Sequence, residues 1–332
     1  MKVAVIGAGS WGTALAQVAA ANRHDVMLWA HRTSVADGIN THHRNPDYLK
    51  DAQLDVRVKA TADVARALEG AQAVIVVTPS KHMRETAQRL VDASMDASVP
   101  AVICTKGVEG GTGLLPVQIY AEVLGGEERF AVLSGPNHAE EIVHGVAAGT
   151  VVASSNPETA AFFQALLGSG SFRVYTSDDV AGVELCAAFK NVIAIAVGVS
   201  YGLGFGDNTA AMLMTRGQAE MGRLVAAVGG DSMTCMGLAG TGDLIATCMS
   251  RHSRNRMFGE ALARGVTVEQ YEAERHMVAE GAQACRTLQT LAERFDVELP
   301  VTDVVRGMVW EGVDPRAASE LLLSREMKPE FY

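Results

Sequence analysis

A lysine and an asparagine lie near the middle of the most apolar stretch of the chain, residues 183–199. Burial disfavours a charged ammonium group and lowers its pKa, so Lys190 could accept a proton from an alcohol and return it in the reverse direction. The alternative is a lysine whose aliphatic stem is buried while its amino group reaches water. The apolar pattern alone favours this second interpretation. A membrane span is disfavoured because Lys190 and Asn191 would be costly at its centre.

A glycine-rich turn near the N-terminus indicates a dinucleotide site. Gly7-Ala8-Gly9-Ser10-Trp11-Gly12 follows the apolar run 3–6 directly and opens an Ala-rich helical pattern. In G-x-G-x-x-G the first glycine permits the tight turn and the second lets a pyrophosphate approach the backbone. The third lets the helix pack on the strand, and the helix N-terminus faces the phosphates. The strand–turn–helix context makes a merely structural turn the weaker alternative.

The end of the second expected strand bears on the choice of cofactor. An NAD-specific site usually places Asp or Glu there, whereas an NADP site offers Arg. The run 26–30 ends in His31-Arg32, with no carboxylate following. This favours the 2′-phosphate of NADPH, although use of NADH as well stays open. The alternative is that both side chains are solvated loop residues.

These residues need elements to position them, and the pattern predicts an α/β fold. Apolar runs separated by helical patterns predict a parallel sheet covered on both faces. Beyond about residue 178 the strand pattern stops and long Ala-, Leu- and Met-rich helical segments follow. We therefore expect a Rossmann-type domain over 1–185 and a mostly helical domain over 186–332. The expected strands cover 3–6, 26–29, 74–78, 101–105, 130–133 and 146–153, and the expected helices cover 14–22, 82–93, 180–200, 208–228, 255–263 and 279–295.

Composition excludes several classes of partner. The 332 residues carry a formal net charge of -10, and an acidic surface makes nucleic acid and anionic membrane poor partners. The five cysteines form no C-x-x-C pair, and the N-terminus enters a strand rather than a signal peptide. Both features predict a reducing, cytoplasmic location. No metal site is expected, because the nine histidines form no H-E-x-x-H motif or zinc-spaced cluster.

Seven short motifs occur in order along nearly the whole chain. They are Gly7-Ala8-Gly9-Ser10-Trp11-Gly12, Cys104-Thr105-Lys106-Gly107, Ser134-Gly135-Pro136, Phe189-Lys190-Asn191, Gly202-Leu203-Gly204-Phe205-Gly206-Asp207-Asn208-Thr209, Gly237-Leu238-Ala239-Gly240-Thr241-Gly242-Asp243-Leu244 and Ser253-Arg254-Asn255-Arg256. By these motifs the chain resembles the bacterial NAD(P)-dependent glycerol-3-phosphate dehydrogenases. Each motif is short, and the shared order makes the resemblance specific.

The resemblance implies a role for each matching residue. Lys190 corresponds to the general base, and Lys106 to a second lysine whose charge would lower the pKa of Lys190. Asp243 corresponds to an acidic residue near the substrate, with an opposing effect on that pKa, so the balance stays open. Arg254 and Asn255 correspond to a clamp for the substrate phosphate, which suits the planar arginine fork. The other implied substrate contacts are Gly135, Asn137, Asn191 and Ser253. The implied cofactor contacts are Gly7, Gly9, Ser10, Trp11, Gly12, His31, Arg32, Lys106, Ala139, Arg254, Val278 and Glu280.

The resemblance also implies an activity and an assembly. It implies reduction of dihydroxyacetone phosphate, a phosphorylated triose, to sn-glycerol 3-phosphate for phospholipid synthesis, with NADPH, in a homodimer. One departure concerns Asn137 and His138, which stand where the family commonly has a small hydroxyl residue and an aromatic one. Two rivals are a β-hydroxyacid dehydrogenase acting on a carboxylate and a non-catalytic NADPH-binding regulator. The Arg254-Asn255 pair argues against the first, and the pairing of Lys106 with Lys190 argues against the second.

Overall fold

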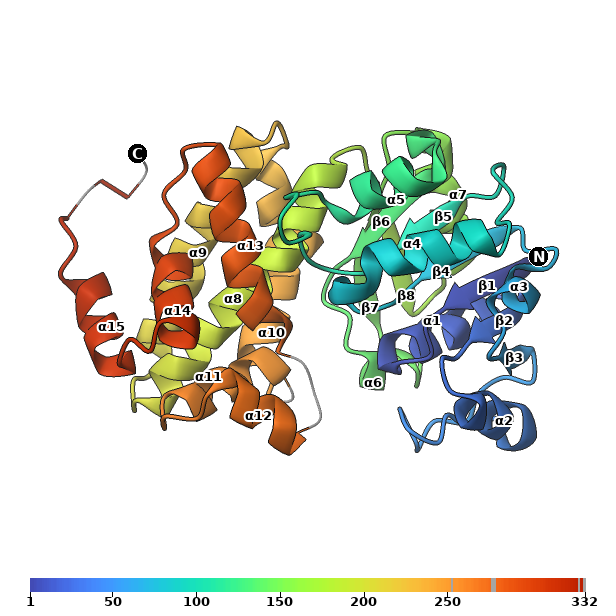
Figure 1. Ribbon diagram of the computed structural model, residues 1–332, viewed down its shortest axis with the longest axis horizontal. Helices are drawn as coiled ribbons and strands as arrows, with labels where there is room; N and C mark the ends of the chain where they lie inside the picture. The colour runs from blue at the N-terminus through green and yellow to red at the C-terminus, as the bar shows by residue number, and fades with distance from the viewer. Residues whose placement is uncertain (252, 276–278, 328, 331–332) are drawn as a thin grey trace.

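The computed structural model describes residues 1–251, 253–275, 279–327 and 329–330. Within these ranges the strands form one eight-stranded sheet in the order β3-β2-β1-β4-β5-β6-β7-β8. Helices cover both faces of the sheet, and a helical region follows it along the chain (Figure 1). The expected α/β class is confirmed. The strands are β1 Lys2–Ile6, β2 Asp25–Trp29, β3 Val58–Thr61, β4 Ala73–Val76, β5 Ala101–Ile103, β6 Phe130–Ser134, β7 Ala148–Ala153 and β8 Phe172–Ser177.

The helices fall into two groups. Those of the sheet domain are α1 Ser10–Ala21, α2 Thr33–His42, α3 Val64–Leu68, α4 Met83–Asp92, α5 Pro116–Leu124, α6 Ala139–Ile142 and α7 Pro157–Leu167, with short turns η1 Ser80–His82 and η2 Glu127–Arg129. Those of the helical region are α8 Val180–Gly202, α9 Asp207–Ala227, α10 Asp243–Met249, α11 Arg254–Leu262, α12 Val268–Arg275, α13 Glu280–Arg294, α14 Pro300–Trp310 and α15 Pro315–Leu323, with η3 Ser232–Met236 and the π turn η4 Leu238–Gly242.

The sheet differs from the expected parallel arrangement at one strand. β7 runs antiparallel to β6, while all the other neighbouring pairs of described strands are parallel. A parallel return requires a long crossover, usually a full helix, and only the four-residue α6 lies in the described connection between β6 and β7. The expectation of a wholly parallel sheet is therefore wrong at this point.

Two strands were not expected from the apolar runs, and both are edge strands. β3 has the sequence VKAT and β8 the sequence FRVYTS, so each mixes polar with apolar residues. An edge strand has one face or one side in solvent and therefore lacks the continuous apolar run of a central strand. A search for such runs finds β1, β2, β4, β5, β6 and β7 and misses these two.

Alternation along the strands divides the core into two. In β1, Ala4 and Ile6 belong to one core, which continues through α4 and α5 into the helical region. Val3 and Val5 belong to the other, which contains the buried faces of α1, α2 and α7. Successive strand residues point to opposite faces, so one short strand contributes to both cores.

The helix α8 is the centre of the helical region. It packs against α9, α10, α11 and α13, and also against β6 of the sheet (Figure 1). It is long and apolar enough to cross a membrane, but 89% of its most apolar window is buried inside the protein. The four helical segments expected beyond residue 178 correspond to α8, α9, α11 and α13, and the structure adds α10, α12, α14 and α15.

Two glycines bring α8 and α11 into backbone contact. A Cβ atom on Gly198 would lie 2.1 Å from the carbonyl oxygen of Arg256, and one on Gly259 would lie 2.2 Å from that of Ile195. These are distances that real Cβ atoms do not adopt, so any side chain here would force the helices apart. This contact sets the position of α11 relative to Lys190, which lies two turns earlier on α8.

We expect Gly198→Ala to lower the free energy of unfolding by about 1–3 kcal/mol, since overpacking at a backbone contact must displace a helix. The matched control is Gly222→Ala in α9, where an added Cβ has no neighbour within 4 Å. That change should raise stability by about 0.5–1 kcal/mol through helix propensity. Urea unfolding measures both, and equal effects would contradict the close contact.

Candidate active site

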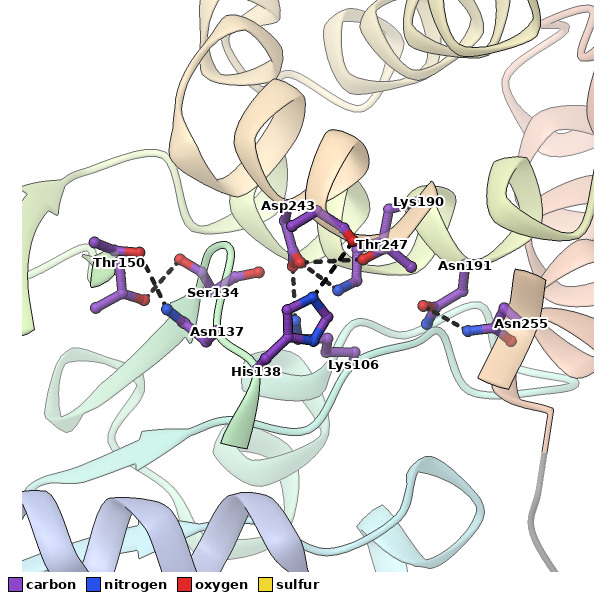
Figure 2. Close-up of polar contacts among 12 residues, drawn as sticks. Lys106, Ser134, Asn137, His138, Thr150, Lys190, Asn191, Asp243, Thr247 and Asn255 are labelled. Atoms are coloured by element: carbon purple, nitrogen blue, oxygen red, sulfur yellow. Dashed lines mark hydrogen bonds and ion pairs between the residues drawn. The ribbon is translucent and has the colours of Figure 1, made fainter. Parts of the chain in front are cut away.

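The centre of the site is one aspartate shared by two lysines. Lys190 lies in the middle of α8, Asp243 begins α10, and Lys106 follows the carboxyl end of β5. The Lys106 Nζ donates to Asp243 Oδ2 at 2.7 Å, and the Lys190 Nζ donates to Asp243 Oδ1 (Figure 2). Lys190 is 7% exposed and Asp243 2%. The structure thus brings together three of the residues that the sequence singled out.

Local packing explains why Asp243 lies where it does. The π turn η4 precedes α10, and a Cβ on Gly240 within it would lie 2.1 Å from the carbonyl oxygen of Cys235. Only glycine fits there, so the turn fixes the start of α10. Thr247, one helical turn after Asp243, donates to its Oδ1 at 3.3 Å. The sequence analysis missed Thr247, although its i+4 spacing on a helix places it on the same face.

The charges of the three groups set their pKa values. Burial lowers the pKa of Lys190 to about 7, and the charge of Lys106 acts in the same direction, while Asp243 opposes both. For Lys106 burial also disfavours the charge, but the carboxylate of Asp243 outweighs it and raises the pKa. For Asp243 burial favours protonation, yet the two lysines together lower the pKa. One carboxylate cannot balance two ammonium groups, and Lys190 is the lysine that loses its proton more easily.

A second group of hydrogen bonds joins three helices beside the lysines. Asn255 of α11 donates from Nδ2 to Oδ1 of Asn191 on α8 at 2.9 Å, and its own Oδ1 accepts from the backbone N–H of Gly281 on α13 at 2.9 Å (Figure 2). Asn191 and Asn255 are both buried. Asn255 therefore fixes α13, and with it Glu280, relative to Lys190.

The residues expected to clamp the substrate phosphate lie at the start of α11. Ser253 is the N-cap of α11, and its hydroxyl accepts from the backbone N–H of Arg256 at 3.3 Å. Arg254 is the first residue of the helix, and its side chain is exposed. A helix N-terminus with an exposed arginine is suited to an anion because the backbone N–H groups and the guanidinium are both donors.

A small pocket lies between the two domains. Lys106 and Ser80 line it from the sheet domain, and Asn191, Glu280 and Gln283 line it from the helical region. The charge of Glu280 contributes to raising the pKa of Lys106. Three residues expected from the sequence, Lys106, Asn191 and Glu280, thus meet around this pocket. Val278, another expected cofactor contact, lies outside the described residues.

The glycine-rich turn fits a dinucleotide. A Cβ on Gly7 would lie 2.7 Å from the carbonyl oxygen of Val77, and one on Gly12 would lie 1.8 Å from that of Gly7. A Cβ on Gly9 would have no neighbour within 4 Å, so space remains beside the second glycine, at the N-cap of α1. Ser10 and Trp11 form the first turn of that helix. This is the arrangement that lets a pyrophosphate approach backbone N–H groups.

A carboxylate from a distant loop lies beside the end of β2. His31 and Arg32 are exposed, as an adenosine-binding position requires, but a carboxylate lies beside Arg32 after all. The Nη2 of Arg32 and Oδ2 of Asp47 are 2.5 Å apart. Asp47 comes from the loop after α2, so inspection of the strand end alone could not find it. The strand end itself carries no carboxylate, as the sequence indicates, and the fold brings Asp47 beside it from another segment.

The segment after β6 holds the remaining expected contacts. A Cβ on Gly135 would lie 2.9 Å from the carbonyl oxygen of Gly149, which explains the glycine by packing against β7. Asn137 donates from Nδ2 to that carbonyl at 3.1 Å, while its Oδ1 is buried with no hydrogen-bond partner. Ala139 is buried at the start of α6. The ring of His138 reaches α10, with Nε2 3.4 Å from the carbonyl oxygen of Ala246 (Figure 2).

The fold and the site together define an NAD(P)-dependent oxidoreductase with a dinucleotide-binding domain and a helical domain. The family models described as NAD-dependent glycerol-3-phosphate dehydrogenase N-terminus and C-terminus match residues 2–160 and 179–320. The chain belongs to the NAD-dependent glycerol-3-phosphate dehydrogenase family.

Individual relatives agree over the full length. A protein of Thermobifida fusca named glycerol-3-phosphate dehydrogenase [NAD(P)+] is 46% identical over 100% of this chain and 99% of its own. One of the same name from Bacillus pumilus is 43% identical over 98% of this chain and 94% of its own. The crystal structure of glycerol-3-phosphate dehydrogenase from Coxiella burnetii is 37% identical with a TM-score of 0.92, covering 98% of this chain and 99% of that one.

We expect Asp243→Asn to lower the free energy of unfolding by about 3–5 kcal/mol near neutral pH, because the buried Lys190 and the partly buried Lys106 lose their counter-charge. The loss of stability should grow as the pH is lowered. The unfolded chain keeps both lysines protonated, whereas the folded site without Asp243 disfavours their protonated forms. Adding Lys106→Met should restore part of the stability by removing one cation. Chemical unfolding across pH measures the stability of the parent, Asp243→Asn and the double variant. If Asp243→Asn were as stable as the parent at every pH, this role for Asp243 would be ruled out.

Proposed function

We propose that the chain reduces dihydroxyacetone phosphate to sn-glycerol 3-phosphate with NADPH, and that Lys190 is the general acid and base. Family membership supports the substrate. The single observation that carries the mechanism is the buried amino group of Lys190, whose pKa is lowered to about 7 and which lies between the two domains. A group with a pKa near the operating pH is suited to transfer a proton in both directions.

The proton step follows from the geometry around Lys190. When bound, a nicotinamide cofactor would supply or accept the hydride at C2 of the substrate. In the reducing direction the ammonium form of Lys190 donates a proton to the C2 oxygen, and in the oxidising direction the neutral amine removes it. Asp243 keeps the amino group oriented by a hydrogen bond, and Lys106 keeps its pKa low by like charge. Thr247 holds the carboxylate of Asp243 in place.

The substrate phosphate is proposed to bind at the start of α11. Arg254 would bind the phosphate with its guanidinium. Ser253 and Asn255 flank Arg254 in the first turn of the helix, and the backbone N–H groups there would be further donors. The proposal is supported by the exposure of Arg254 and by the hydrogen bond from Asn255 to Asn191, the residue that follows Lys190 on α8. Gly135 and Asn137 are proposed as further substrate contacts from the sheet domain.

The cofactor is proposed to lie along the carboxyl edge of the sheet. Its pyrophosphate would meet Gly7, Gly9, Gly12 and the first turn of α1 with Ser10 and Trp11, and its adenosine end would meet His31 and Arg32. The nicotinamide end would be near Lys106, Ala139 and Glu280. Strand register supports this path, because Ile6 pairs with both Trp29 and Val76, so these strands end at the same edge.

The setting of the enzyme is also a proposal. We assign the cofactor half to residues 1–185 and the substrate half to 186–332, a division that falls within the second turn of the continuous helix α8. A cytoplasmic location is supported by five buried free cysteines. A homodimer and a role in glycerophospholipid synthesis rest on the family. The acidic net charge of -10 argues against nucleic acid or anionic membrane as partners.

Absorbance of the reduced nicotinamide tests the substrate and the base together. With dihydroxyacetone phosphate we expect oxidation of NADPH that Lys190→Met lowers by about 10²–10⁴-fold in kcat, with NADPH binding retained. Lys59→Met, an exposed lysine on β3, is the control. Initial rates of reduction should fall as the pH rises through about 7, and those of glycerol 3-phosphate oxidation should rise, because Lys190 titrates there. NADPH binding without oxidation would contradict the proposed substrate and redirect the search to carboxylate substrates. A ketopantoate reductase of Ralstonia eutropha shares the fold, at 19% identity and a TM-score of 0.62, over 96% of this chain and 100% of that one.

The phosphate clamp has its own test. We expect Arg254→Ala to raise KM for dihydroxyacetone phosphate by about 10- to 100-fold, the size of a charge-assisted hydrogen bond, with a smaller effect on kcat. Arg251→Ala, an exposed arginine just before the clamp, controls for the local positive charge. Steady-state kinetics of both variants decide the matter. Equal changes in KM would show that general charge, and not the position of Arg254, attracts the phosphate.

A further inference from the structure

The ion pair between Arg32 and Asp47 lies at the cofactor's expected adenosine end. Arg32 comes three residues after Trp29, the last residue of β2. This strand end lies next to the glycine-rich turn, because the Gly7 N–H donates to the carbonyl oxygen of Trp29 at 3.2 Å. Asp47 comes from the loop after α2 and reaches back to the guanidinium at 2.5 Å. One cation and one anion thus stand together where cofactor-specific sites of this fold usually place one or the other.

The loop that carries Asp47 is built onto the dinucleotide turn. Asn45 is buried, and its Nδ2 donates to the carbonyl oxygen of Ala8 at 3.0 Å and to the Thr13 hydroxyl at 2.9 Å. Its Oδ1 accepts from the backbone N–H groups of Asp47 and Tyr48, each at 3.1 Å. Asn45 therefore fixes the backbone at Asp47 relative to the glycine-rich turn. These hydrogen bonds hold the loop so that the Asp47 carboxylate lies beside Arg32.

The pair itself is easily separated. The side chains of Arg32 and Asp47 are 56% and 36% exposed. Exposed ion pairs contribute little to stability, so a competing anion or hydrogen-bond donor can take either partner at small cost. The fixed backbone at Asp47 keeps its carboxylate close while Arg32, on a long flexible side chain, is free to turn to another anion.

We propose that Asp47 is a specificity-determining residue that supplies the carboxylate missing from the end of β2 and lets the site accept NADH as well as NADPH. With NADH, Asp47 accepts hydrogen bonds from the hydroxyls of the adenosine ribose. With NADPH, the 2′-phosphate takes Arg32 away from Asp47. The inference rests on the proposed function only for the identity of the cofactor, and it concerns binding rather than the reaction.

The test measures dissociation constants for NADH and NADPH separately, from the fluorescence of the bound nicotinamide and without substrate. In Asp47→Ala we expect binding of NADH to weaken by about tenfold, the size of a lost charge-assisted hydrogen bond. Binding of NADPH should tighten by about two- to fivefold, because Arg32 no longer has a competing partner and a like charge is gone. The backbone N–H of residue 47 still donates to Asn45, so the loop should keep its position.

Two controls separate the pair from general effects. Asp51→Ala removes an exposed carboxylate four residues later and should leave the ratio of the two constants unchanged. In an Arg32→Ala background, Asp47→Ala should tighten NADPH less than it does in the parent protein, because only the loss of the like charge then contributes. Parallel changes for both cofactors in Asp47→Ala, or the same ratio change in Asp51→Ala, would overturn the inference. A shifted ratio in a protein that fails to reduce dihydroxyacetone phosphate would uphold it and reject the proposed substrate instead.

Discussion

The arrangement depends on one buried carboxylate that is shared by two lysines. Asp243 hydrogen-bonds to Lys106 from the sheet domain and to Lys190 from the helical domain, so one residue joins the two halves at the reacting position. Because a single negative charge faces two ammonium groups, one of the lysines is held near neutrality, and it is the more deeply buried Lys190. With two lysines and one carboxylate, the charges are not balanced, and this makes the contact less stabilising. The same imbalance lowers the pKa of Lys190 and makes it suitable for transferring a proton.

That geometry is maintained by contacts between backbones as much as by side chains. Gly198 and Gly259 let α8 and α11 touch. Asn255 of α11 donates to Asn191 of α8 and accepts from the N–H of Gly281, which extends the contact to α13. The exposed Arg254 therefore projects from a rigid scaffold, one residue before a buried asparagine. In the sheet domain, Asn45 has a similar positioning role, because its hydrogen bond to Ala8 joins a surface loop to the glycine-rich turn. In both places a buried amide positions a charged neighbour that faces solvent.

Prediction from sequence succeeded where the determining residues are neighbours along the chain. The glycine-rich turn and the helix α8 with Lys190 are local patterns, and each lies where it was expected. The helix expected over 255–263 is also present, beginning one residue earlier at Arg254. It failed where polar edge strands hide the period, as in β8, and where a short connection reverses a strand, as in β7. Thr247 was within reach of sequence reasoning through its helical spacing from Asp243. Asp47 was not, because it lies beside Arg32 only through the fold of the loop after α2.

The sequence by itself determined the class of protein, the dinucleotide turn and a lysine within an apolar helix, since strand alternation, glycine placement and helix periodicity are written in consecutive residues. Whether burial and Lys106 outweigh Asp243 in setting the pKa of Lys190 was decided only by the tertiary structure. Lys106 and Asp243 are 137 residues apart, and Lys190 and Asp243 are 53 apart. The pKa of Lys190 depends on burial and on the distances to both partners, and these quantities exist only once the two domains have packed against each other.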